Sequence, residues 1–151
     1  MNIKMIKNDW IIEIDIQRTR KFYEEYDIEE DCKCNNCMNY RVNCDFMSPE
    51  LLDFFNQLGV DPRKEGEFMS LYLNNNNEVL YLGFYHLVGK ILEGPKKVSD
   101  KWQSTNLIKI NNFEFAFSSA EIACVPEDFP EPIIQLEFSS FIPWRLEEKH
   151  D

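Results

Sequence analysis

The residues with the greatest chemical potential are four clustered cysteines: Cys32, Cys34, Cys37 and Cys44. They form a C-x-C-x2-C-x6-C array. Closely spaced thiolates can supply several ligands of a tetrahedral zinc site from one short loop, because zinc binds cysteine sulfur at about 2.3 Å. If this segment binds a metal ion, the spacing predicts a structural zinc clip with Cys32, Cys34 and Cys37 as ligands. Cys44 or His86 would be the fourth ligand.

Two other interpretations of the cysteines stay open. Thiols often pack as small, partly buried side chains, and this interpretation is favoured over zinc. Cys34 and Cys37 also form a C-x2-C pair that could act as a redox dithiol. That interpretation ranks third, because the carboxylates of Glu29, Glu30 and Asp31 disfavour a thiolate and the βαβ setting of such dithiols is not evident.

His86 is the other residue that invites a chemical hypothesis. It lies on a predicted strand, where an imidazole could bind a metal ion or act as a base. A partly buried structural histidine is the favoured interpretation. The chain has one further histidine, His150, and no recognisable nucleophile motif, so a catalytic triad is not indicated.

The elements that must position these residues are predicted by apolar alternation and by helical spacing. Residues 10–16 alternate apolar with acidic side chains, which predicts a half-buried strand. One helix is predicted near residues 17–27. A second helix is predicted at 48–58, because Ser48 is a favourable N-cap ahead of a proline and Gly59 is a favourable C-terminal residue.

The cysteine segment, residues 29–43, contains almost no aliphatic side chains. Apolar burial alone therefore cannot order it, and no regular element is predicted there. Some other interaction must hold this segment against the rest of the protein.

Strands dominate the pattern after residue 66. Two hairpins are predicted, one from 68–73 and 78–92 and one from 107–110 and 113–117, followed by a strand at 134–138. The run at 78–92 is long enough for two strands. These elements predict a single α+β domain over residues 1–151, in which an antiparallel sheet of about five to seven strands is covered on one face by two main helices.

Composition and charge narrow the classes of partner. The net charge is −11 and the isoelectric point is near 4.6, which opposes binding to nucleic acid or to anionic membranes. Four carboxylates, Glu13, Asp15, Glu114 and Glu137, alternate with apolar residues and could line one acidic sheet face, although solvation alone is the favoured explanation. An acidic surface suits a basic protein partner.

The expected location is the cytoplasm. Five cysteines without a visible secretory signal are typical of a reducing compartment. No apolar run is long enough for a membrane span.

Several short motifs are distributed along the chain: Trp10, Thr19 to Tyr23, Asp31 to Cys34, Cys37 to Tyr40, Leu58 to Pro62, Tyr85 to Gly89 and Pro143 with Trp144. Together they resemble a family of small uncharacterised bacterial proteins with a C-x-C-x2-C-x-N-Y segment. That family has no assigned activity. The resemblance implies one intact domain in a bacterial cytoplasm and carries over no catalytic residue.

The sequence therefore favours a noncatalytic protein-binding module, with a basic protein as the expected partner and zinc as the cofactor if the cysteines bind a metal ion. The alternative is a small enzyme or thiol protein that uses the cysteine segment or His86.

Overall fold

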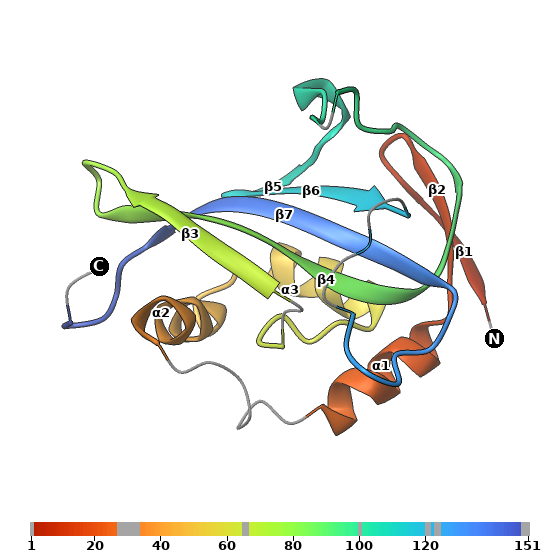
Figure 1. Ribbon diagram of the computed structural model, residues 1–151, viewed down its shortest axis with the longest axis horizontal. Coiled ribbons are helices and arrows are strands. Elements are labelled where there is room, and N and C mark those ends of the chain that lie inside the picture. The colour runs from red at the N-terminus through yellow and green to blue at the C-terminus, as the bar shows by residue number, and fades with distance from the viewer. Residues whose placement is uncertain are drawn as a thin grey trace.

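The computed structural model describes residues 2–26, 34–64, 67–99, 101–119, 122 and 125–148. In this part of the chain an antiparallel sheet of seven strands carries three helices on one face (Figure 1). The elements in order are β1 (Ile3–Lys7), β2 (Trp10–Ile14), α1 (Ile16–Glu25), α2 (Asn35–Cys44), α3 (Pro49–Leu58), β3 (Glu67–Leu73), β4 (Glu78–Glu93), a short 3-10 helix (Ser104–Asn106), β5 (Ile108–Ile110), β6 (Phe113–Ser118) and β7 (Ile133–Pro143). The predicted α+β class is confirmed.

The sheet is organised around β4. The strand order is β1-β2-β4-β7-β6-β5. The remaining strand, β3, also pairs with β4. One edge of β4 carries β7, and the other carries β3 and then β2. Both predicted hairpins are present, but β4 is a single strand of 16 residues and is not divided into two. The sequence interpretation had no strand at β1.

The helix that follows β2 takes the place of a strand along part of β4. Between the segments paired with β3 and β2, the hydroxyl of Tyr23 donates to His86 O at 2.8 Å and accepts from His86 N at 3.0 Å. Further along, Val88 N donates to Thr19 Oγ1 at 3.0 Å, and Asp15 N donates to Val88 O at 2.9 Å. Residues of α1 and its N-cap thus satisfy buried backbone groups that a neighbouring strand would otherwise pair.

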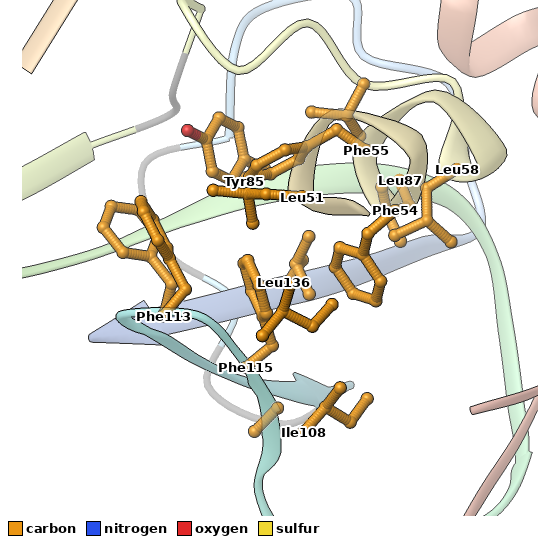
Figure 2. Close-up of a cluster of buried hydrophobic side chains, with 14 of the residues drawn as sticks. Leu51, Phe54, Phe55, Leu58, Tyr85, Leu87, Ile108, Phe113, Phe115 and Leu136 are labelled. Atoms are coloured by element: carbon orange, nitrogen blue, oxygen red, sulfur yellow. The ribbon is translucent and has the colours of Figure 1, made fainter. Parts of the chain in front are cut away.

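The core lies between α3 and the sheet (Figure 2). Ser48 Oγ accepts from Leu51 N at 3.1 Å and caps the start of α3, while Gly59 ends it at φ 79°, as predicted. The ring of Phe54 stacks on Phe115 of β6 at 4.5 Å between centroids, and Phe55 meets Tyr85 edge-on at 5.2 Å. Each such buried aromatic contributes about 1.5–3 kcal/mol through loss of water contact.

The cysteine segment departs from the sequence interpretation, because its C-terminal part forms the helix α2. Asparagines attach this helix to the end of β7. Asn39 Nδ2 donates to Pro143 O at 3.2 Å and to Tyr81 Oη at 3.3 Å, and Asn39 Oδ1 accepts from Arg145 N at 2.8 Å. Asn43 Nδ2 donates to Pro143 O at 3.0 Å, and Asn43 Oδ1 accepts from Arg145 Nε at 2.7 Å. Buried amides therefore supply the anchoring that aliphatic residues do not.

Candidate functional site

Two of the predicted zinc ligands lie together at the start of α2. Cys34 is the N-cap residue and Cys37 lies in the first turn, and their Sγ atoms are 3.4 Å apart. The Cys34 side chain is exposed and that of Cys37 is partly buried. Cys32 lies outside the described residues.

The other two predicted ligands occupy different surroundings. Cys44 is the last residue of α2, is buried, and its thiol donates to Tyr40 O at 3.4 Å. His86 lies on β4 and is 1% exposed. Its ring packs edge-on against the rings of Phe84 and Phe129, with ring centroids 5.3 Å and 5.8 Å apart. Within the described part of the chain, no group of three or more cysteine, histidine or acidic side chains is placed to hold a metal ion. The zinc clip stays a prediction.

A buried tyrosine lies next to the cysteine pair. Tyr81 Oη donates to Asn36 O at 2.8 Å in the first turn of α2. Burial raises the pKa of Tyr81 from 10.0 to about 12, the bond from Asn39 opposes this rise, and the negative charges of Cys37 and Cys34 add to it. Tyr81 thus joins the first turn of α2 to the sheet.

The second candidate lies on the sheet face that the helices leave uncovered, and we call it the sheet-face groove. It is a depression of about 510 Å³. Its lining includes apolar side chains and three carboxylates: Met69, Leu82, Phe84, Trp102, Glu67, Glu114 and Glu137.

Strand register explains why the carboxylates gather in the groove. Glu67 of β3 lies opposite Phe84 of β4, and Phe84 lies opposite Glu137 of β7. Directly opposed residues of antiparallel strands project from the same face, so these side chains form one row. Glu114 of β6 lies opposite Ser139, in the next row, and is a diagonal neighbour of Glu137.

Glu137 is the most firmly held of these carboxylates. Its Oε1 accepts from Lys97 Nζ at 3.0 Å and from Trp102 Nε1 at 3.1 Å, and its Oε2 accepts from Gln135 Nε2 at 3.3 Å. Lys97 also lies 5.7 Å from the centre of the Trp102 ring, within cation–π range. These contacts join the segment that follows β4 to the face of β7.

The groove can therefore present negative charge beside apolar surface. Among the described residues, three carboxylates and one ammonium group, that of Lys97, line it, and Lys97 already pairs with Glu137. The floor is supplied by Leu82 and Phe84. A ligand that combines positive charge with an apolar side chain fits this chemistry.

The sequence indicated only part of this groove. Alternation identified Glu114 and Glu137 as candidates for a shared acidic face, and both line the groove. The two other candidates lie elsewhere, since Asp15 caps α1 and Glu13 lies opposite Lys90 on β2 and β4. The sequence did not indicate that Lys97 and Trp102 belong to the groove. A loop after β4 brings them to Glu137 of β7, which is distant in the sequence.

Comparison with known proteins adds no relative: no family model, curated protein or solved structure matches this chain. The resemblance to the bacterial family stays a prediction. Among the described residues, no helix has the length and apolar character needed to cross a bilayer.

Proposed function

We propose that this protein is a noncatalytic binding module whose sheet-face groove holds a basic, extended segment of a partner protein. The observation that carries the proposal is the placement of Glu67, Glu114 and Glu137 around the apolar surface of Leu82 and Phe84. Lysine or arginine side chains of a partner would pair with the carboxylates, while alternate apolar side chains would cover the floor.

The edge strand β3 favours an extended partner segment. It pairs with β4 along one edge, and within the described residues no strand pairs with its other edge. Its apolar side chains remain exposed, with Met69 at 58% and Leu71 at 48%. A strand with open backbone groups and exposed apolar residues is a template for addition of another strand. A segment added to β3 would lie beside the groove, since Glu67 and Met69 belong to both.

The net negative charge of the whole chain also favours a basic partner. A net charge of −11 attracts a basic segment over a distance of about one Debye length, roughly 8 Å at physiological ionic strength. This attraction accelerates encounter, and the groove carboxylates then select the site.

The test is titration with a fluorescent peptide that alternates lysine and valine, monitored by anisotropy. The unmodified protein should bind this peptide and not its glutamate–valine counterpart, and binding should weaken as salt rises. Glu114→Lys should weaken binding by about fivefold to tenfold, because an attraction of up to about 1 kcal/mol is replaced by repulsion.

Glu25→Lys is the matched control, because it makes the same change in net charge at an exposed position in the last turn of α1. It should reduce binding by less than about twofold. If the two variants lose the same amount of affinity for the peptide, binding depends on net charge alone, which would contradict a binding site in the groove. Absence of binding by the unmodified protein would contradict the proposal itself.

A further inference from the structure

The pair Cys34 and Cys37 forms a site of its own at the start of α2. The 3.4 Å between the two Sγ atoms exceeds a disulfide bond by about 1.4 Å, a distance that rotation about the side-chain bonds can close. Cys34 precedes the first turn and Cys37 lies within it, so the backbone already holds the two thiols near each other. Such proximity replaces a bimolecular encounter with an intramolecular one.

The local surroundings favour reaction at Cys34. Its side chain is exposed, which gives a small molecule access to the sulfur. Cys34 occupies the N-cap position of α2, and Cys37 Sγ lies 3.4 Å away within the first turn. An incoming small molecule therefore meets the exposed Cys34 Sγ before the partly buried Cys37 Sγ.

We infer that Cys34 and Cys37 exchange reversibly between a dithiol and a disulfide, with a low-molecular-weight disulfide of the glutathione type as the oxidant. The Cys34 thiolate attacks one sulfur of the oxidant, and a mixed disulfide forms as the first small thiolate leaves. The Cys37 thiolate then attacks Cys34 Sγ, and the second small thiolate leaves. The protein pair loses two electrons and two protons, and the oxidant becomes two thiols.

This inference is independent of the groove. It also differs from the zinc prediction in what it requires, because a disulfide needs only the two sulfur atoms that the structure brings together. A tetrahedral zinc site needs two further ligands. The dithiol interpretation, ranked third from the sequence, is thus favoured more strongly by the sulfur–sulfur distance and by the exposure of Cys34.

The chain offers a direct test by peptide mapping. Trypsin cleaves after Lys33 and Arg41, so one peptide, residues 34–41, contains Cys34 and Cys37 and no other cysteine. The full-length protein is equilibrated with mixtures of reduced and oxidised glutathione, quenched in acid, alkylated and digested. The inference predicts that oxidation makes this peptide lighter by two hydrogen atoms and resistant to alkylation, and that excess reduced glutathione reverses both changes.

Two variants test the order of the steps. Cys37→Ser should stop at the mixed disulfide and retain one glutathione group on Cys34, whereas Cys34→Ser should lower the rate of glutathione attachment to the peptide at least about tenfold. The mapping of the unmodified protein stands even if a variant fails to fold. The inference is overturned if the peptide stays a dithiol in oxidised glutathione, or if the purified protein holds zinc that protects both thiols from oxidation.

Discussion

Replacement of Asn39 by alanine should destabilise the protein by about 2–4 kcal/mol, because its side chain makes three hydrogen bonds in a fully buried position. Each bond contributes about 1 kcal/mol net. Pro143 O keeps its bond from Asn43, but Arg145 N loses its acceptor. For a domain of this length the loss corresponds to a fall in Tm of about 6–12 °C.

The assay is urea unfolding monitored by tryptophan fluorescence, with thermal unfolding as a second measurement. Asn35→Ala is the matched control on the same helix, since Asn35 begins α2 and is only partly buried. It should change stability by no more than about 0.5 kcal/mol. If Asn39→Ala and Asn35→Ala unfold at the same urea concentration, the amide network does not anchor α2 and the reasoning is refuted.

Three further predictions concern the core. Tyr23→Phe should cost about 2 kcal/mol in urea unfolding, because it removes the hydroxyl that satisfies two backbone groups of β4, while exposed Tyr72→Phe should cost almost nothing; equal effects would contradict this role. Gly89→Ala should cost about 3 kcal/mol, since the new Cβ would lie 2.3 Å from Glu13 O on β2; unchanged stability would show that the strands separate easily. The pKa of Tyr81 is raised from 10.0 to about 12, so the unfolded chain loses this proton first and the free energy of unfolding should fall as pH rises from 10 to 12. Tyr81→Phe should remove that part of the pH dependence. The prediction is refuted if the difference in phenolate absorbance between the unmodified protein and Tyr81→Phe titrates near pH 10.

The sequence indicated the elements whose signals are local. The helix α3 has a capping serine, apolar residues at helical spacing and a terminal glycine, and all three features appear in the structure. The hairpin of β5 and β6 likewise follows from alternation around two asparagines. In contrast, α2 has no apolar stripe, and its anchoring residues Asn39 and Asn43 bond to a strand about 100 positions later in the chain. Local spacing carries no information about such partners.

The candidate sites likewise combine features that local spacing indicated with features that depend on the sheet topology. The C-x2-C spacing drew attention to Cys34 and Cys37 as neighbours in a short loop, but no helix was predicted there. In the structure the start of α2 brings their Sγ atoms to 3.4 Å. Alternation identified Glu114 and Glu137 as strand residues. Their grouping with Glu67 depends on the order β3-β4-β7-β6, which the sequence did not reveal.

The groove is tested most directly by nuclear magnetic resonance with the alternating lysine–valine peptide. The indole N–H of Trp102 reports on the groove, because it donates to Glu137, and Trp102→Phe assigns its signal among the three tryptophans of the chain. Addition of peptide should shift this signal and the amide signals of β3, and leave those of α1 and α3 unchanged. Shifts confined to the helices, or an unmoved Trp102 signal while the peptide binds, would contradict a binding site on this face of the sheet.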